Sequence, residues 1–268
     1  MMKKLVFFDI DGTLLDDEKK LPESTKQAVA DLQEAGHTVA IATGRAPFAF
    51  EPLLRELNIN TYVSINGQYA EHNDEAIYKN PLRASVLEEL ELHAKLRNHP
   101  LMYVNEENWY SNTEEHPHIS AAIDSLRVNQ KVTYDPMFYQ DGVVYQAFLF
   151  CEEYGETAYR QAFSDLEFIR WHDYAVDVMP AGGSKAAGIK KLTEHLQFSP
   201  YDVYAFGDGL NDIKMLQTVK NSIAMGNASD VVKEAASAVT KAVNEDGIWH
   251  GVRMAGLVSN GIPRTIRR

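Results

Sequence analysis

The chain has 268 residues and a net charge of −12 at pH 7, and 45% of its residues are hydrophobic and 24% charged. A chain of this length buries a substantial core, usually as one large domain or two smaller ones, and its composition excludes long disordered stretches. The negative charge argues against nonspecific binding to nucleic acid, because such binding draws its affinity from contacts with phosphates.

The first third of the chain predicts alternating strands and helices. We expect a strand from Lys4, a helix near Ser24 to Ala35, a strand from Thr38 to Ala42, a helix to Leu57 and a strand from Tyr62 to Ile65. The spacing of Ala28, Leu32 and Ala35 is typical of one helix face, with a proline before the helix and a glycine after it. Repeated βαβ units with right-handed crossovers predict a doubly wound, mostly parallel sheet.

The pattern changes after Asn66-Gly67 and then returns. We expect a hairpin around Asn73-Asp74, a helix from Ala84 to Arg97, strands near Met102 and Tyr110, and strands at Val143 to Phe150, Phe168 to Trp171 and Tyr174 to Val178. The α/β pattern resumes at Ser184 with a helix to Leu196 and a strand to Phe206, and continues to Val258. The fold class is therefore α/β: a Rossmann-like core of residues 1–82 and 183–268, with a smaller α+β cap domain inserted at 83–182.

Acidic residues follow two of the predicted strands. Asp9 and Asp11 come directly after one apolar run, and Asp208 and Asp212 come after another. Side chains at positions i and i+2 of a strand point the same way, and open parallel sheets bind ligands at the carboxyl ends of their strands. If both strands lie in one parallel sheet, the four carboxylates meet at one edge of it.

Such a cluster of carboxylates needs a balancing charge. Two carboxylates at ~4 Å repel each other by on the order of 4 kcal/mol at an effective dielectric constant near 20. A bound cation is the simplest remedy, and oxygen ligands with no neighbouring His or Cys favour a hard ion. Because the site must also hold a phosphate oxygen and waters, we expect octahedral Mg²⁺ rather than Ca²⁺.

Four motifs in a fixed order carry a resemblance to a known family. They are Asp9-Ile-Asp-Gly-Thr13, Ala42-Thr-Gly-Arg45, Gly183-Ser-Lys185 and Gly207-Asp-Gly-Leu-Asn-Asp212. With these motifs the chain resembles the haloacid dehalogenase superfamily of phosphotransferases, in its Cof-like sugar-phosphatase branch with a type IIB cap. Further stretches are similar to that branch, among them Ser64-Ile-Asn-Gly67 and Ala224-Met-Gly-Asn-Ala228. The resemblance spans nearly the whole chain.

The resemblance implies a role for each acidic residue. Asp9 is expected to be the nucleophile that accepts the phosphoryl group. Asp11 is expected to protonate the leaving oxygen and then to deprotonate the attacking water, and its backbone carbonyl faces the metal. Asp9, Asp11 and Asp208 are the expected Mg²⁺ ligands, while Asp212 acts through water or orients Lys185.

The same resemblance implies a set of phosphate-binding residues. The transferring phosphoryl group is expected to contact Thr43, Gly44, Lys185 and Asn211. Thr43 offers a hydroxyl and a backbone amide near a helix start, and Lys185 offers a point charge where a second helix begins. Arg45 is compatible with two roles, contact with the substrate or an ion pair with a carboxylate of the core.

These residues predict a Mg²⁺-dependent phosphatase that hydrolyses a small phosphorylated metabolite through an aspartyl-phosphate intermediate. Sugar phosphates, flavin mononucleotide and pyridoxal phosphate all remain open as substrates, because cap contacts select among them. Two alternatives stay open. One is a phosphosugar mutase, and the other is a phosphometabolite-binding protein without turnover.

The compartment and the remaining partners follow from what the sequence lacks. Cys151 is the single cysteine, so no intrachain disulfide can form; it is interpreted as a small apolar residue in a strand, with no assigned role. Asp9 and Asp11 interrupt the first apolar stretch, whereas a signal peptide has an uninterrupted apolar stretch. No stretch approaches the ~20 apolar residues of a membrane span. We therefore expect a cytoplasmic protein without nucleic-acid or membrane partners, and its oligomeric state stays open.

Overall fold

The computed structural model describes residues 2–126, 128 and 130–258, and the chain divides into two compact units. Unit 1 comprises the described residues of Met1–Gly44, Pro52–Tyr78 and Ser184–Arg268, and unit 2 comprises Arg45–Glu51 and Lys79–Gly183. The main part of unit 2 thus runs from 79 to 183, whereas the predicted cap domain runs from 83 to 182. Unit 2 also includes a short segment from the first third of the chain.

Unit 1 is built on an eight-stranded sheet in the order β14-β13-β12-β1-β2-β3-β4-β5. The strands are β1 (Leu5–Phe8), β2 (Thr38–Ala42), β3 (Thr61–Ser64), β4 (Tyr69–His72), β5 (Glu75–Lys79), β12 (Val203–Gly207), β13 (Asn221–Ala224) and β14 (Ala238–Val239). All pairs from β14 to β3 are parallel, and β4 runs antiparallel to β3. The predicted hairpin is confirmed, since Asn73 and Asp74 join β4 to β5 with positive φ angles of 51° and 63°.

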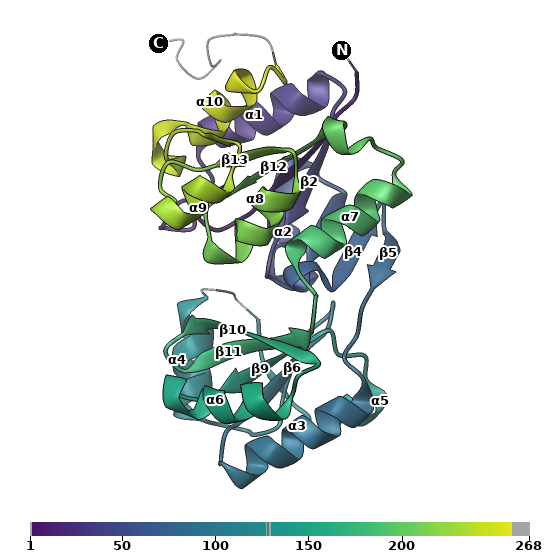
Figure 1. The fold of residues 1–268 in the computed structure, drawn as a ribbon, viewed down its shortest axis with the longest axis vertical. Coiled ribbons are helices and arrows are strands. Elements are labelled where there is room, and N and C mark those ends of the chain that lie inside the picture. The colour runs from purple at the N-terminus through teal and green to yellow at the C-terminus, as the bar shows by residue number, and fades with distance from the viewer. Residues whose placement is uncertain (1, 127, 129, 259–268) are drawn as a thin grey trace. The chain divides into compact units, whose positions relative to one another are not determined.

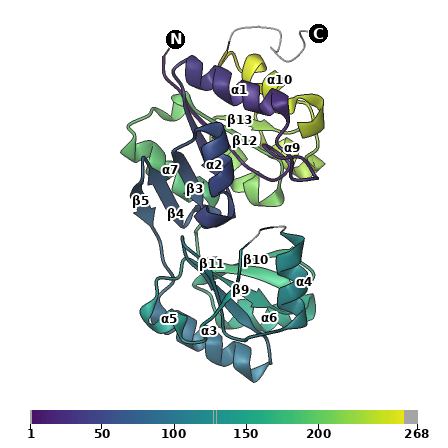
Figure 2. The same cartoon turned by 180° about the vertical axis from the view of Figure 1, so that it is seen from behind.

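Helices cover both faces of this sheet, as Figures 1 and 2 show from opposite sides. One face carries α1 (Glu23–Glu34), α2 (Glu51–Leu57) and α10 (Gly247–Met254), and the other carries α7 (Lys185–His195), α8 (Ile213–Thr218) and α9 (Asp230–Ala235). Successive strand residues point to opposite faces: Ala205 packs in the core with α7 and α8, while the Phe206 ring lies against Gly251 of α10. The predicted doubly wound α/β fold is confirmed.

Unit 2 is an α+β layer with a six-stranded sheet in the order β10-β11-β9-β6-β7-β8. Its strands are β6 (Leu101–Val104), β7 (Trp109–Ser111), β8 (Thr133–Tyr134), β9 (Gln146–Phe150), β10 (Leu166–His172) and β11 (Ala175–Pro180). Its helices are α3 (Ala84–Leu96), α4 (Pro117–Ser125), α5 (Phe138–Asp141) and α6 (Glu153–Ala162). Leu87 and Leu90 of α3 and Tyr159 of α6 share one core with strands β6, β9, β10 and β11.

The sequence predicted α3 but none of the three later helices of unit 2. Helix α4 buries Ile119, Ala122 and Ile123, whereas the buried residues of helix α6 are Glu156 and Tyr159. Glu156 is buried because Arg160 and Arg170 bind its two carboxylate oxygens. A pair of arginines therefore binds the acid that α6 buries.

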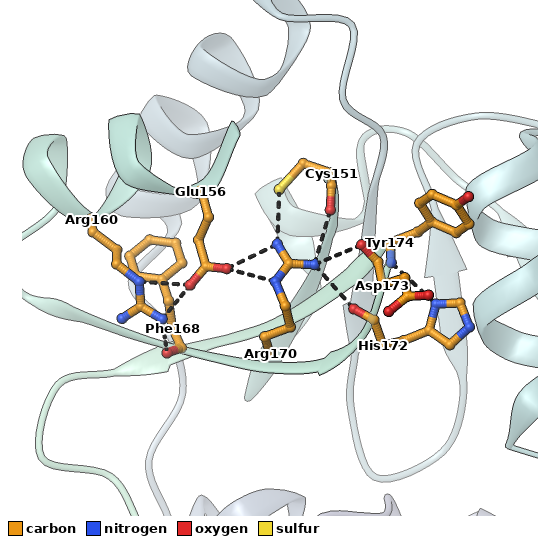
Figure 3. A network of polar contacts seen from close by, with 8 residues as sticks. All are labelled: Cys151, Glu156, Arg160, Phe168, Arg170, His172, Asp173 and Tyr174. Atoms are coloured by element: carbon orange, nitrogen blue, oxygen red, sulfur yellow. Dashed lines mark hydrogen bonds and ion pairs between the residues drawn. The ribbon is translucent and has the colours of Figure 1, made fainter. Parts of the chain in front are cut away.

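Arg170 also organises the chain around Cys151, as Figure 3 shows. Its guanidinium donates to Glu156, to the backbone carbonyl of Cys151 at 3.2 Å, and to the carbonyls of His172 and Asp173 at 3.0 and 2.9 Å. Burial raises the pKa of the Cys151 thiol, and Arg170 opposes that rise only partly. Because the thiolate is the reactive form of cysteine, Cys151 is poorly suited to act as a nucleophile.

Candidate active site

The carboxyl ends of β1 and β12 bring the first two acidic motifs together. These strands are parallel neighbours with Phe8 paired to Phe206, and the amide of Asp9 donates to the Phe206 carbonyl at 3.0 Å. Gly12 has a φ of +78°, and a Cβ atom there would lie 2.1 Å from Oδ2 of Asp208. Only glycine allows the loop after Asp9 to approach Asp208 this closely.

Lys185 is buried between two carboxylates. Its Nζ atom lies 2.6 Å from Oδ1 of Asp9 and 2.7 Å from Oδ1 of Asp212. The exposed fractions are 1% for Lys185, 6% for Asp9 and 0% for Asp212, so water screens these charges little. Burial by itself would lower the pKa of Lys185, but Asp212 and Asp9 together raise it above its ordinary value. Lys185 therefore stays a cation.

The position of Lys185 in α7 makes this pairing necessary. Lys185 is the first residue of the helix, and the Ser184 side chain caps the helix by accepting from the Ala187 amide at 3.2 Å. The N-terminus of a helix carries partial positive charge, so a lysine there is disfavoured unless anions are close. Asp9 and Asp212 supply those anions.

Asp212 links this ion pair to the loop that follows β12. Its Oδ2 atom accepts from the backbone amides of Asp208 and Gly209, both at 3.0 Å, while its Oδ1 atom holds Lys185. Asp212 therefore uses both oxygens, one to orient Lys185 and one to shape the loop that carries Asp208.

Two residues outside the predicted set hold Asp208 in place. Thr13 donates its hydroxyl to Oδ1 of Asp208 at 2.7 Å, and Asn227 donates to Oδ2 at 3.3 Å. Asn227 also donates to the Gly12 carbonyl at 2.9 Å and accepts from the Val243 amide, so it joins three loops. Both residues lie inside stretches that carry the family resemblance, Asp9–Thr13 and Ala224–Ala228, and this membership is the signal in the sequence that points to them.

The acids carry more negative charge than the protein neutralises. Asp9, Asp208 and Asp212 each offer a carboxylate oxygen within 4.8 Å of the others, the one such cluster among the described residues. Burial, reinforced by Asp212, Asp208 and Asp11, raises the pKa of Asp9 to about 8 although Lys185 opposes the rise. Burial likewise raises the pKa of Asp208 to about 6. A hard cation fits this all-oxygen donor set and would relieve the excess charge.

The side chain of Asp11 has a different partner from the other acids. Its Oδ1 atom lies 2.6 Å from the ammonium group of Lys19, a residue that the sequence analysis did not single out. Asp11 forms a parallel backbone bridge with Leu15, and the Gly12 amide donates to the Leu15 carbonyl at 2.8 Å. The loop after β1 therefore turns back on itself beside Asp11.

Thr43 and Gly44 lie at the same edge of the sheet, just after β2. Thr43 is buried, its amide donates to the Val63 carbonyl at 2.9 Å, and its carbonyl accepts from the Asn66 amide at 3.1 Å. A Cβ atom on Gly44 would lie 2.9 Å from the Asn66 side chain, which sits on a left-handed backbone with φ of 51°. Asn66 thus belongs to this edge although it was not among the predicted site residues.

The last two predicted residues are Asn211 and Arg45. Asn211 is exposed, with its side-chain oxygen close to Gly209. Arg45 belongs to unit 2, whereas Thr43 and Gly44 belong to unit 1, so the boundary between the units falls inside the Ala42–Arg45 motif.

Comparison with known proteins identifies the family. The family model described as haloacid dehalogenase-like hydrolase matches residues 6–252. The chain belongs to this family, within its Cof-like branch, and is a phosphatase of the superfamily. The predicted family and enzyme class are confirmed.

Full-length relatives agree with this assignment. YkrA of Bacillus subtilis (strain 168) is 45% identical over 258 residues, which cover 96% of this chain and 100% of the relative. The pyridoxal phosphate phosphatase YbhA of Escherichia coli (strain K12) is 30% identical and covers 89% of this chain and 93% of its own length. The structure of the HAD subclass IIB sugar phosphatase BT4131 matches with a TM-score of 0.85 and 30% identity, over 96% of this chain and 100% of that one.

Within the described ranges, no helix combines the length and apolar character that a membrane crossing requires.

Proposed function

We propose that this phosphatase hydrolyses a small phosphomonoester with Mg²⁺, through a phosphorylated Asp9. The observation that carries the proposal is the buried cluster in which one cation, Lys185, is shared by Asp9 and Asp212 while Asp208 adds a third carboxylate. Burial, reinforced by neighbouring carboxylates, raises the pKa of Asp9 to about 8 and that of Asp208 to about 6, and a divalent cation would favour the ionised form of both.

Asp9, Asp208 and the backbone carbonyl of Asp11 are the groups that would hold Mg²⁺. When bound, the ion supplies positive charge that keeps Asp9 ionised and offsets the charge of the phosphoryl oxygens. Asp212 serves this arrangement indirectly, because it orients Lys185 and the loop of Asp208.

The first displacement places the phosphoryl group on Asp9. A carboxylate oxygen of Asp9 attacks phosphorus in line with the leaving oxygen, and the bond between phosphorus and that oxygen breaks. Asp11 donates a proton to the leaving oxygen, so the product departs as an alcohol. Positioned proton transfer of this kind contributes typically about 10²- to 10⁴-fold to the rate.

The second displacement returns Asp9 to its starting state. Asp11, now ionised, removes a proton from a water molecule as that water attacks phosphorus. The bond between phosphorus and the Asp9 oxygen breaks, and inorganic phosphate leaves. Atoms and charges balance over the two steps as the hydrolysis of one ester by one water.

The phosphoryl group is bound in this proposal by Lys185, Thr43, Gly44 and Asn211. Lys185 offers a buried positive charge, and the residues after β2 offer a hydroxyl and backbone amides near a helix start. Arg45 keeps its two proposed roles, contact with the substrate or with a carboxylate of the core.

The substrate class is a small phosphorylated metabolite. Relatives that match over nearly the full chain are named as phosphatases of pyridoxal phosphate and of sugars, which supports this class and not one compound. We propose that residues 83–182 form the cap domain and that its side chains select the leaving group.

The test is phosphate release from a panel of phosphorylated metabolites and an aryl phosphate, with Mg²⁺ or with a chelator. Wild-type protein should release phosphate only with Mg²⁺, and Asp9→Asn should lose at least about 10³-fold because no covalent intermediate can form. Asp17→Asn, which changes an exposed aspartate of the same loop, is the matched control and should keep full activity.

Three outcomes would contradict the proposal. Full activity in purified Asp9→Asn would exclude Asp9 as the nucleophile, and equal activity in chelator would exclude the metal. A bisphosphate requirement with no net loss of ester would instead indicate a mutase.

A further inference from the structure

A short loop presents Lys19 to Asp11. Oδ1 of Asp16 accepts from the amides of Glu18 and Lys20, both at 2.9 Å, and the Lys19 amide donates to the Asp16 carbonyl at 2.9 Å. The Asp16 amide donates to the Lys20 carbonyl at 3.0 Å and closes the loop. Four hydrogen bonds around Asp16 therefore set the direction in which the Lys19 side chain leaves the backbone.

The backbone of Lys19 is one that lysine rarely adopts. Its φ angle is +62°, in the left-handed region that favours glycine and asparagine. Strained residues of this kind gather at functional sites, where the surrounding structure holds them. The backbone conformation at this position does not favour lysine. We therefore attribute the presence of lysine to the contact that its side chain makes.

The side chain of Lys19 makes a close ion pair. Its Nζ atom lies 2.6 Å from Oδ1 of Asp11, and the two side chains are 33% and 38% exposed. The neighbouring Lys20 differs, because it is 72% exposed and pairs with Glu18, itself a surface residue. Two adjacent lysines in one loop thus have different partners, an acid of the site and an acid of the surface.

We propose that Lys19 is a positioning residue that holds the Asp11 carboxylate toward the leaving oxygen. The inference rests on the proposed function, in which Asp11 exchanges a proton with that oxygen and then with water. The ammonium of Lys19 restrains Oδ1, and with it the plane of the carboxylate, in both steps. Proton transfer needs hydrogen-bond geometry, so a carboxylate that turns away loses the rate advantage of a positioned acid.

Lys19→Asn separates this role from the fold. Asparagine tolerates the left-handed backbone at least as well as lysine, so the loop should keep its shape without the cation. Because the pair is partly exposed, we expect the melting temperature of Lys19→Asn to stay within about 3 °C of the wild type. Lys20→Asn is the matched control, and Lys19→Arg tests whether another cation restores the wild-type behaviour.

Kinetics on two substrates distinguish a positioning role from a purely structural one, because a structural defect would lower kcat equally on both. For an alkyl phosphate, Lys19→Asn should lower kcat roughly 10- to 100-fold with little change in KM. For p-nitrophenyl phosphate, whose leaving group needs little protonation, the loss should stay below about 3-fold. Lys19→Arg should recover most of the loss, and Lys20→Asn should match the wild type on both substrates.

Equal losses on both substrates, or wild-type kcat in Lys19→Asn, would overturn the inference. The crystal structure of Lys19→Asn gives a second test that needs no turnover. The Asp11 side chain should change its orientation, and an unchanged Asp11 would also overturn the inference. Failure of the proposed function can be distinguished from failure of the inference about Lys19. In that case the wild type would release no phosphate, or Asp9→Asn would stay active.

Discussion

Replacement of Lys185 by methionine tests the buried ion pair most directly. Methionine matches the length of the lysine side chain but carries no charge, so the substitution leaves packing nearly intact. It removes the cation that lies 2.6 Å from Asp9 and 2.7 Å from Asp212, two carboxylates that are almost fully buried. The substitution therefore removes the cation that opposes the rise in the pKa of Asp9 and leaves Asp212 buried without its ion pair.

The expected loss of stability follows from this burial. Removing one partner of a buried ion pair typically costs about 3 to 5 kcal/mol, because the other charge stays buried and unpaired. A loss of about 4 kcal/mol corresponds to about 8 to 16 °C in melting temperature for a protein of about 150 to 250 residues. We therefore expect a shift of this size for Lys185→Met in the absence of metal.

The assay is thermal and urea unfolding in chelator at pH 8, with two further variants. Lys190→Met removes an exposed lysine of the same helix, whose partner Glu194 lies 3.9 Å away, and should cost less than about 1 kcal/mol. Lys185→Met combined with Asp212→Asn removes one of the unpaired charges and should recover part of the loss.

The result that would refute this reasoning is a cost below about 1 kcal/mol for Lys185→Met at pH 8. Such a result would mean that water or relaxation of the loops neutralises the cluster without the lysine. Failure of the double variant to recover stability would place the cost in packing and not in charge.

Two other predictions concern the same part of unit 1. The pKa of Asp9 is raised to about 8 and that of Asp208 to about 6, so the folded state binds these protons more tightly than the unfolded state. Binding of these protons therefore stabilises the folded state fully below about pH 4, and this stabilisation is lost as the pH rises through 6 and 8. Metal-free protein should melt at a lower temperature at pH 8 than at pH 5, and added Mg²⁺ should raise the melting temperature more at pH 8; equal effects at both would contradict this. Gly67→Ala should lose more than about 2 kcal/mol in urea unfolding, because its φ is +91° and a Cβ would lie 1.9 Å from the Ser184 carbonyl oxygen. Gly36→Ala, with φ of +85° and no atom within 4 Å of its Cβ, should lose only about 1 to 2 kcal/mol, and equal losses would exclude the close contact as the cause.

Local patterns were enough to predict strands β1, β2, β3 and β12 of unit 1, but they did not give strands β13 and β14 individually. Strands β1 and β2 are short, mostly apolar runs, and alternation with helices of apolar spacing leaves few topologies. The hairpin at Asn73-Asp74 was equally local, because both residues tolerate positive φ angles. The helices α4, α5 and α6 were not predicted, and one of them, α6, buries an acid that is paired with two arginines.

The cluster of acidic residues could be predicted for a related reason. Asp9 and Asp208 each follow an apolar strand, and neighbouring parallel strands end at one edge of a sheet. Their motifs then indicated the family, which the comparisons confirm. The individual roles of the site residues remain proposals that the variants above test.

The sequence by itself determined most of the strands of the parallel sheet, that acids end two of them, and which family the chain belongs to, because periodicity and motifs are properties of neighbours along the chain. The tertiary structure decided the charge pairing: Lys185 is shared by Asp9 and Asp212, Lys19 binds Asp11, and Asn227 joins the loop of Gly12 to Asp208. The contacts of Lys185 and Asn227 join residues that are far apart in sequence. The contact between Lys19 and Asp11 depends on the loop that the hydrogen bonds of Asp16 close. Burial and distance set their strength, and neither quantity exists until the chain has folded.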